Sequence, residues 1–296
     1  MLGSDFVSLP KLPRRVLRAR HVLGFAALAL RSLSVVSAGP TTVRCFNPAL
    51  AQRLGMPLSF ATSHDDGDDG GIVIREGQDL RLEVVDLTVS SKPFRIDFCS
   101  QEVQQRLSRA SSELVVKAIG KTDRVIDLTA GLGRDSVMLA ASGKIGQVLM
   151  LERNALVFHL LDDAISRLRV CNPVVGGRVQ GLLNADATQM KNATALLETL
   201  PIENRCIYLD PMYPIGAVGR KSLVKKETQI LHHLVAGDEE CEKTNNAALF
   251  ATAKFLATNR IVVKRPINAS PLDLGAVLPS YSVKGKAQRF DVYTIL

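Results

Sequence analysis

One stretch near the middle of the chain, Arg124 to Asp135 (RVIDLTAGLGRD), constrains the fold more than any other. Its residues Val125 to Leu128 predict a short buried strand, and a helical pattern starts near Arg134. Between them stand Gly131 and Gly133, which lack a Cβ and let the backbone turn tightly and approach a ligand closely. A helix that begins directly after such a turn presents free N–H groups to that ligand. The stretch therefore predicts the ligand cradle of an α/β sheet.

Short apolar runs alternate with helical patterns from this stretch to the C-terminus. Further strands are predicted at residues 148–151, 182–184, 206–209, 261–263 and 290–295. Helical patterns separate most of these runs, and Asn154 can cap the first of them. Such alternation is typical of a mostly parallel sheet that helices cover on both faces. We therefore predict a doubly wound α/β domain over residues 100–296.

The region before this domain has a different pattern. Residues 43–99 consist of short alternating runs, with strands predicted at 71–75 and 80–85 and a turn between them. We interpret residues 43–99 as a small β-rich N-terminal subdomain. A helical pattern then runs from Gln101 to Ile119 and ends at Gly120, a residue typical of helix C-caps.

Residues 1–42 have the composition of a targeting segment. They are rich in Arg, Leu, Ala and Ser and contain a single acid, Asp5. The apolar run from Val22 to Leu30 is nine residues long, which is too short to span a bilayer. We expect import into a mitochondrion or a plastid, or a cytoplasmic protein if the source is bacterial, with no membrane association after import. A surface amphipathic helix of the mature protein is the alternative interpretation.

The net charge of +8 comes mostly from the N-terminal end. Residues 1–60 hold eight Lys and Arg and one acid, whereas the other 236 residues hold 29 basic and 28 acidic groups. Because the folded part is nearly neutral, binding to RNA must depend on local basic patches.

The five cysteines and the five histidines are dispersed, and no two cysteines are spaced as CxxC. This pattern argues against a disulfide framework and against a zinc site, and it favours a reducing compartment. We predict that the protein works without a metal.

Four acidic residues fall at or just past the ends of four successive predicted strands: Asp127, Glu152, Asp186 and Asp210. Open α/β sheets bind ligands outside the carboxyl ends of their strands, so these side chains should converge. Glu152 follows Asp127 by 25 residues, close to the spacing at which an acid accepts hydrogen bonds from a ribose diol. Asp186 would lie near an adenine amine, although a helix N-cap explains it nearly as well.

Two cofactor classes would fit a nucleoside cradle of this kind. A nicotinamide cofactor requires G-x-G-x-x-G/A, but Ser136 occupies the third position, and Asp135 places an anion where a pyrophosphate would lie. S-adenosyl-L-methionine has a cationic sulfonium and no phosphate, so several carboxylates suit its charge. We therefore predict S-adenosylmethionine (SAM) rather than NAD.

The loop after the fourth strand of the domain, Asp210-Pro211-Met212-Tyr213-Pro214, suggests the acceptor. The exocyclic amine of a nucleobase is a poor nucleophile because its lone pair is delocalised into the ring. The Asp210 carboxylate and the carbonyls of the loop, stiffened by Pro211, could hold both N–H groups and aim the nitrogen at the methyl group. Tyr213 would stack on the extruded base. Alternatively, the loop is a proline-stiffened turn in which Tyr213 is only packed.

The chain resembles the bacterial small-subunit ribosomal RNA guanine-N2 methyltransferases of the RsmJ type. The similarity runs from about residue 49 to the C-terminus, and the segments that carry it are DLTAGLGRD (127–135), MLERN (150–154), YLDPMYP (208–214), SLVKKE (222–227), VVKRP (262–266) and RFDVY (289–293). The resemblance implies a Rossmann-like class I methyltransferase fold, SAM as cofactor, and methylation of one guanosine N2 in small-subunit ribosomal RNA.

The resemblance also implies which residues contact the cofactor. These are Arg134, Asp135, Glu152, Arg153, Asp186, Ala187 and Asp210. The chain departs from the family in two segments, since Asp186-Ala187 replaces a pair of serines and residues 105–111 replace a segment rich in histidine and glycine. The N-terminal 42 residues have no counterpart in the family.

The implied partner is small-subunit ribosomal RNA or the small ribosomal subunit, which requires basic residues near the catalytic loop. The residues predicted to contact RNA phosphates are Lys225, Lys226, Lys264, Arg265 and Arg289. Each group could instead be an ordinary solvated surface.

Three other functions fit parts of the pattern. The Asp-Pro-x-aromatic loop also fits an N-methyltransferase for another amine, such as adenine N6 or a protein glutamine. The same fold could serve a non-catalytic ribosome-assembly factor, and the glycine turn alone fits a nicotinamide oxidoreductase.

Overall fold

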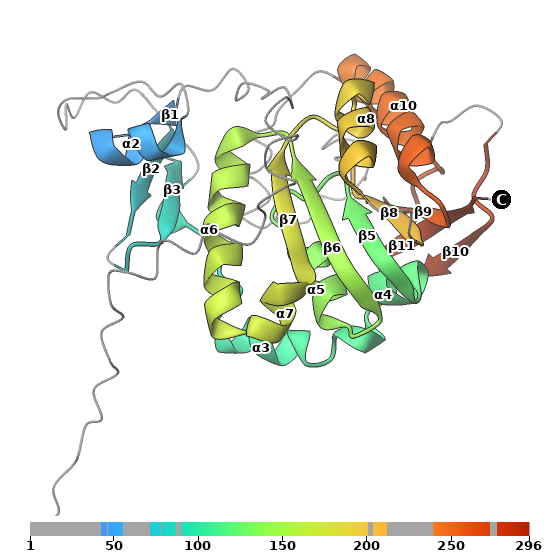
Figure 1. The fold of residues 1–296 in the computed structure, drawn as a ribbon, viewed down its shortest axis with the longest axis horizontal. Helices are drawn as coiled ribbons and strands as arrows, with labels where there is room; N and C mark the ends of the chain where they lie inside the picture. The colour runs from blue at the N-terminus through green and yellow to red at the C-terminus, as the bar shows by residue number, and fades with distance from the viewer. Residues whose placement is uncertain are drawn as a thin grey trace, which may run out of the picture.

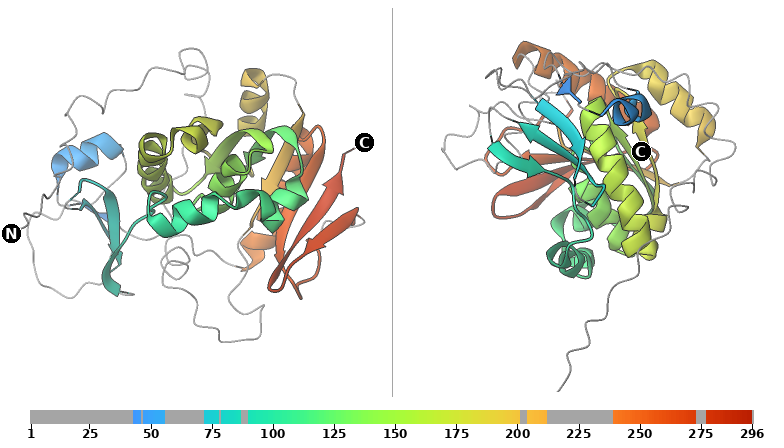
Figure 2. Two further views of the ribbon diagram at one scale, coloured as in Figure 1. Left: turned by 90° about the horizontal axis from the view of Figure 1, so that it is seen from below. Right: turned by 90° about the vertical axis from the view of Figure 1, so that its left-hand side faces the viewer.

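A computed structural model of the protein describes residues 43–45, 47–55, 72–77, 79–86, 90–200, 204–211, 239–272 and 277–295. These residues form a seven-stranded sheet with the order β10-β11-β9-β8-β5-β6-β7 and a four-stranded sheet with the order β1-β2-β3-β4 (Figure 1). The two sheets lie at opposite sides of the long helix α6 (Ala155–Cys171), and β10 and β11 are farthest from the smaller sheet (Figures 1 and 2).

The centre of the large sheet is parallel, as predicted. Its parallel strands are β5 (Thr122–Asp127), β6 (Ile145–Glu152), β7 (Val179–Asn184), β8 (Arg205–Leu209) and β9 (Arg260–Pro266). The chain builds β5, β6 and β7 outward in one direction and then returns to place β8 on the other side of β5. The order therefore reverses between β5 and β8, and ligands of open α/β sheets bind at such a reversal.

Two antiparallel strands close the sheet at the C-terminal end of the chain. Strand β11 (Gln288–Thr294) pairs with β9, and β10 (Tyr281–Lys284) pairs with β11. The strand β10 was not predicted, because half of its side chains are exposed and its apolar pattern is weak.

Alternate residues of the central strands pack into two separate hydrophobic cores. Val125 packs on the side of α5 (Arg134–Ala141), α6 and α4 (Leu114–Ile119), whereas the next residue, Ile126, packs on the side of α8 (Met190–Thr199) and α10 (Glu239–Leu256). Neighbouring side chains of a strand point to opposite faces, so a strand that is apolar throughout needs helices on both. The predicted doubly wound arrangement is thus confirmed.

The N-terminal region is β-rich, as predicted. It contains β1 (Val43–Arg44), β2 (Ile72–Glu76), β3 (Leu82–Asp86) and β4 (Ser90–Phe94), together with the short helix α2 (Pro48–Leu54). Its apolar residues continue into the core on the α6 side of the large sheet. Two hydrogen bonds join the N-terminal region to helix α6. The Leu82 N–H donates to Asp163 at 3.3 Å, and Arg167 donates to the Leu80 carbonyl at 2.8 Å.

The single helix predicted from Gln101 to Ile119 is wrong. The segment divides into α3 (Gln101–Leu107), the 3-10 turn η3 (Ala110–Ser112) and α4. The hydroxyls of Ser108 and Ser112 donate to backbone carbonyls three residues earlier, which competes with helix continuation. Gly120 does end α4, with a positive φ of 72°.

The dispersed cysteines argued against a disulfide framework, but the structure contains a disulfide. Cys99, just before α3, forms a disulfide with Cys171 at the end of α6, and their Cα atoms are 6.1 Å apart. The two residues are separated by 72 positions, so no local spacing could indicate the bond. The cysteine pattern therefore no longer argues for a reducing compartment.

A short helix, α7 (Pro173–Arg178), follows the disulfide and leads into β7. Within the residues that the structure describes, no helix is both long and apolar enough to cross a membrane.

Candidate active site at the carboxyl ends of the strands

The loop between β5 and α5 has the positive φ angles that its glycines allow, 51° at Gly131 and 70° at Gly133. Among the described residues, the nearest atom to a Cβ added at Gly131 would be the Thr129 carbonyl oxygen at 3.9 Å, an ordinary van der Waals contact. A Cβ at Gly133 would instead lie 2.5 Å from Leu161 Cδ1 and 3.4 Å from Phe98 Cζ. Gly131 is therefore the residue that leaves the loop open to a ligand. At Gly133 an added Cβ would point into the protein interior, so the missing Cβ there makes room for Leu161 and Phe98. The predicted contact of the Gly133 backbone with a cofactor stays a prediction.

Asp127 braces this loop from the end of β5. Its side chain is buried and accepts hydrogen bonds from the Thr129 N–H at 3.0 Å and from the Ser136 hydroxyl at 2.6 Å. Burial raises the pKa of Asp127 to about 7, although the hydrogen bonds from Ser136 and Thr129 lower it. Asp127 thus joins the two sides of the loop to each other.

Glu152 ties the same loop to the end of β6. One carboxylate oxygen accepts the Gly131 N–H at 2.8 Å, and the other accepts the Asn154 N–H at 2.8 Å. Burial raises the pKa of Glu152, and these backbone donors oppose the rise. The carboxylate lies directly beside the open glycine, where a ribose acceptor was expected. Arg153 and, across the loop, Arg134 are exposed.

Asp186 follows β7 and closes the turn before α8. Its carboxylate accepts hydrogen bonds from the Thr188 N–H at 2.9 Å and from the Thr188 hydroxyl at 2.7 Å. The N-cap of α8 is Gln189, so the alternative interpretation of Asp186 as that N-cap is wrong. Ala187 is buried in the core on the α8 side.

Three charged side chains interact with one another at the ends of β8 and β9. The Lys264 ammonium is 2.8 Å from a carboxylate oxygen of Asp210 and 2.8 Å from one of Asp135. The Tyr208 hydroxyl donates to the same Asp135 oxygen at 2.6 Å. We call Tyr208, Asp210, Lys264 and Asp135 the β8–β9 cluster. It contains two carboxylates and one ammonium, so it carries a net charge of −1 when all three are ionised.

The pKa shifts of the cluster follow from these contacts. Burial alone would lower the pKa of Lys264, but Asp210 and Asp135 outweigh it and raise that pKa. Burial raises the pKa of Asp210, Lys264 lowers it, and Asp135 raises it. Burial and the nearby carboxylates, Asp135 foremost, raise the pKa of Tyr208 well above its ordinary value. At neutral pH the tyrosine is therefore a neutral donor and the lysine a cation.

The glycine loop and the β8–β9 cluster share one hydroxyl. Thr129 Oγ1 accepts the Asp210 N–H at 2.6 Å and lies 3.4 Å from Asp127 Oδ1, to which it donates. Thr129, Ser136 and Tyr208 were not predicted as site residues. The sequence indicates them only by position: Thr129 lies just before the glycines, Ser136 in the first turn of the helix that follows them, and Tyr208 two residues before Asp210.

Two of the residues predicted to bind RNA are buried. Arg265 donates to the Ser270 carbonyl, and Arg289 pairs with Asp291 at 2.9 Å and donates to three carbonyls between Pro266 and Ala269. Because these guanidinium groups hold the turn after β9, we do not include them in an RNA surface. Lys225, Lys226 and Tyr213 lie outside the described residues, and Pro211 is buried directly after Asp210.

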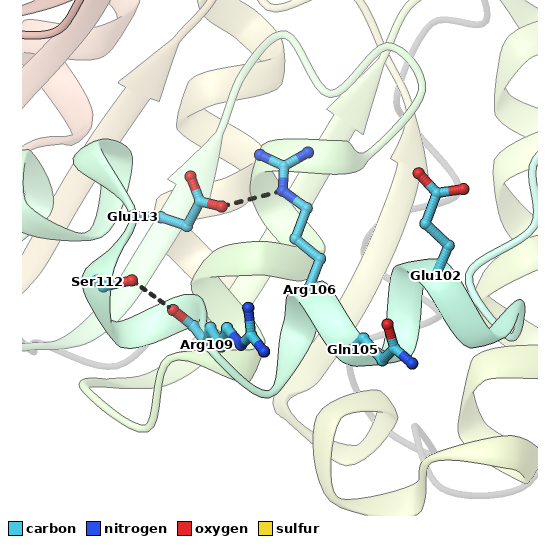
Figure 3. Close-up of a pocket in the computed structure, with 6 residues that line it drawn as sticks. All are labelled: Glu102, Gln105, Arg106, Arg109, Ser112 and Glu113. Carbon is cyan, nitrogen blue, oxygen red and sulfur yellow. Dashed lines mark hydrogen bonds and ion pairs between the residues drawn. The ribbon is translucent and has the colours of Figure 1, made fainter.

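A separate hollow of about 380 Å³ lies on α3 and η3 (Figure 3). Its lining residues are Glu102, Gln105, Arg106, Arg109, Ser112 and Glu113. Arg106 Nε donates to Glu113 at 3.0 Å, a bond that raises the pKa of Arg106, and the charge of Asp135 adds to the rise. None of the four acids at the strand ends lines this hollow, so it is distinct from the predicted site.

In the parts of the chain that the structure describes, no group of three or more His, Cys, Asp or Glu side chains is arranged to hold a metal. That the protein works without a metal stays a prediction from the sequence.

Known proteins are similar to most of the chain. A family model described as "Putative SAM-dependent methyltransferase" matches residues 58–295. The chain is 39% identical over 206 residues to ribosomal RNA small subunit methyltransferase J of Yersinia pestis, covering 67% of this chain and 74% of that protein. It is 34% identical over 252 residues to the protein of the same name from Pseudomonas paraeruginosa, covering 82% and 87%.

The chain is also similar to a solved structure, and the similarity covers nearly the whole of that structure's chain. The solved structure is the crystal structure of a SAM-dependent methyltransferase from Neisseria gonorrhoeae, with a TM-score of 0.62 and 28% identity, covering 86% of this chain and 96% of that one. The Rossmann-like fold class predicted from the strand pattern is thereby confirmed.

Proposed function

Because the chain belongs to the SAM-dependent methyltransferase family that includes ribosomal RNA small subunit methyltransferase J, we propose that it methylates the exocyclic N2 of a guanosine in small-subunit ribosomal RNA. The same family membership confirms the predicted cofactor, S-adenosylmethionine. When bound, this cofactor supplies an electrophilic methyl group on a cationic sulfur. Everything else in the reaction depends on how the chain holds the two reactants and where it places charge.

The residues at the strand ends fit such a cofactor. Gly131 leaves space above the loop, and Glu152 lies beside it with its carboxylate fixed by two backbone N–H groups. The net negative charge of the β8–β9 cluster favours a cation nearby. We therefore infer that the nucleoside part lies over Gly131 and Glu152 and that the sulfonium faces the cluster.

The observation that carries the proposed acceptor chemistry is the placement of Asp210. Its side chain is 37% exposed, at the point where the strand order reverses, while its backbone N–H is held by Thr129 of the glycine loop. A carboxylate in this place can accept an N–H of the guanine amine and keep the nitrogen directed at the methyl group. It can also take the proton that the nitrogen must lose when it becomes a secondary amine.

The experiment is methyl transfer from labelled S-adenosylmethionine to isolated small ribosomal subunits by the full chain. We expect label in the ribosomal RNA, recovered after digestion as N2-methylguanosine. The Asp210→Ala variant should lose at least about a hundredfold in rate while its affinity for the cofactor stays nearly unchanged. If this variant turned over at the wild-type rate, the role of Asp210 in holding the amine would be wrong.

Other labelled products would point to the alternative functions. Label in adenosine or in a ribosomal protein would show that the methyl acceptor is another amine and not guanine N2. Binding of the cofactor and of the subunit without any label would favour an assembly factor.

We also propose that residues 1–42 direct the protein to an organelle whose ribosomes are of the bacterial type. The support is their acid-poor, arginine-rich composition, together with bacterial relatives for the rest of the chain.

A further inference from the structure

We propose that Lys264 is a positioning residue for methyl transfer, which keeps the Asp210 carboxylate ionised and directed at the acceptor amine. This inference rests on the proposed role of Asp210. It assigns Lys264 to the interior of the active site, rather than to the RNA phosphates for which the sequence suggested it.

The strand register brings the two residues together. Strands β8 and β9 are parallel, with Tyr208 opposite Val262 and Leu209 opposite Val263, so the next residues along are Asp210 and Lys264. Residues paired in this way point to the same face of a sheet, which here is the face covered by α5. The first turn of α5 supplies Asp135 to the same ammonium.

The lysine is held from more than one direction, which makes it suitable for positioning. Its ammonium contacts Asp210 and Asp135 at equal distances of 2.8 Å, and the Tyr208 hydroxyl donates a 2.6 Å hydrogen bond to the same Asp135 oxygen. The side chain of Lys264 is 23% exposed. A phosphate contact would have to compete with two carboxylates that already neutralise this ammonium.

The charge balance explains why an ammonium is needed. Asp210 is faced by Lys264 from β9, by Asp135 from α5 and by Asp127 from β5, while Arg106 of α3 acts on Asp135 from farther away. Among the titratable groups that the structure describes near Asp210, removal of Lys264 would leave the acids Asp135 and Asp127 and the neutral Tyr208. Two neighbouring carboxylates then share a proton, because like charges disfavour ionisation. A protonated Asp210 could not take the proton that the amine loses on methylation. Without a negative charge it would also no longer favour the cationic sulfonium.

The sign of the pH effect follows directly. Activity requires ionised Asp210, so it is lost as the pH falls through the pKa of that residue. Removing the ammonium of Lys264 raises this pKa and moves the acid limb of the pH–rate profile to higher pH. Removing the negative charge of Asp135 lowers the pKa of Asp210 and moves the acid limb to lower pH.

The test compares Lys264→Met, Lys264→Arg and Asp135→Asn in the full chain, with Lys254→Met as a control on the exposed side of α10. For Lys264→Met we expect the acid limb of the pH–rate profile to move to higher pH by about one to two units. We also expect kcat at neutral pH to fall by about tenfold or more. Lys264→Arg should keep the wild-type limb, Asp135→Asn should shift it downward, and the control should change neither.

A second readout does not depend on turnover. In protein without cofactor, labelled with ¹³C at aspartate carboxyls, the Asp210 resonance is identified by its loss in Asp210→Asn. Its titration midpoint should rise in Lys264→Met and fall in Asp135→Asn. If the rate falls while both the limb and the midpoint stay at their wild-type values, Lys264 has only a structural role and the inference is wrong. If Lys264→Met does not fold, Lys264→Gln is titrated in its place, because it also removes the ammonium but keeps a polar side chain.

The two proposals can fail separately. If the wild-type chain transfers no methyl group to small subunits, the proposed substrate is wrong, while the titration of Asp210 still tests the coupling to Lys264.

Discussion

At the scale of single residues, the two glycines of the β5–α5 loop have different physical tasks. Both have a positive φ, but only the space at Gly131 is open, whereas Gly133 packs against Leu161 and Phe98. Gly143, just after the same helix, has a φ of 72°, and no atom of the described residues lies within 4 Å of an added Cβ. The variant Gly143→Ala therefore measures the backbone strain of a left-handed alanine without a steric overlap, and it serves as the matched control for Gly133→Ala.

We expect Gly133→Ala to lower the free energy of unfolding by about 1–3 kcal/mol more than Gly143→Ala does, because its Cβ overlaps a buried leucine. Both variants also bear the strain of a left-handed residue, about 1–2 kcal/mol. Chemical denaturation of the two variants measures the difference. If both variants lost the same free energy of unfolding, Leu161 would be able to move away from the new Cβ without destabilising the core.

Asp127 should give stability an unusual pH dependence. Its pKa of about 7 in the folded protein exceeds the value of about 3.9 in an unfolded chain. The folded state therefore binds more protons between these values, and stability contributed by Asp127 falls as the pH rises from about 4 to about 7. In Asp127→Asn this part of the slope should disappear, since the amide can accept from Thr129 and donate to Ser136. Denaturation at several pH values checks this, and an unchanged slope would contradict it.

At the scale of elements, the disulfide joins the start of α3 to the end of α6. Phe98, next to Cys99, packs behind the glycine loop, so the bond anchors the segment on which that loop rests. A crosslink across 72 positions restricts the unfolded chain strongly.

Removing the disulfide in the double variant Cys99→Ser/Cys171→Ser should lower the free energy of unfolding by up to about 4 kcal/mol, from the length of the loop it closes. The melting temperature of the wild type should fall on addition of a reductant, and that of the double variant should not. If reductant lowers both equally, the effect does not come from this pair.

At the scale of the whole molecule, the charge is divided between two regions. The residues after position 60 are nearly neutral, and the excess of basic groups lies before them. Two of the predicted RNA-binding arginines are buried, which leaves fewer basic side chains for RNA on the described surface. We therefore expect recognition to depend on the shape of an assembled subunit more than on bulk charge.

The N-terminal segment can be tested in cells that contain both mitochondria and plastids. Residues 1–42 fused to a fluorescent protein should accumulate in one of these organelles, because their composition is that of a transit peptide. A chain in which the arginines of this segment are replaced by glutamine is the control. Diffuse cytosolic fluorescence of the unaltered fusion would contradict the proposal.

Much of the fold and the position of the site could be predicted from local patterns. Runs of apolar residues predicted the five parallel strands, the glycines predicted the loop after β5, and the acids at the strand ends predicted that charged side chains gather at one edge of the sheet. These inferences succeed because side-chain periodicity reflects burial, and because the carboxyl ends of parallel strands meet at one edge. The predicted helix at 101–119 failed where serine hydroxyls compete for backbone groups, an effect that apolar periodicity does not report.

The contacts between distant residues were decided only by the tertiary structure. Lys264 meets Asp210 and Asp135 because β9 pairs with β8 in one register and α5 covers that face. The same arrangement joins Cys99 to Cys171 and places Leu161 behind Gly133. The sequence alone determines which side chains lie at the active edge. Whether a charged side chain there faces a partner, the solvent or the core depends on strand order and packing, which join residues far apart in the chain.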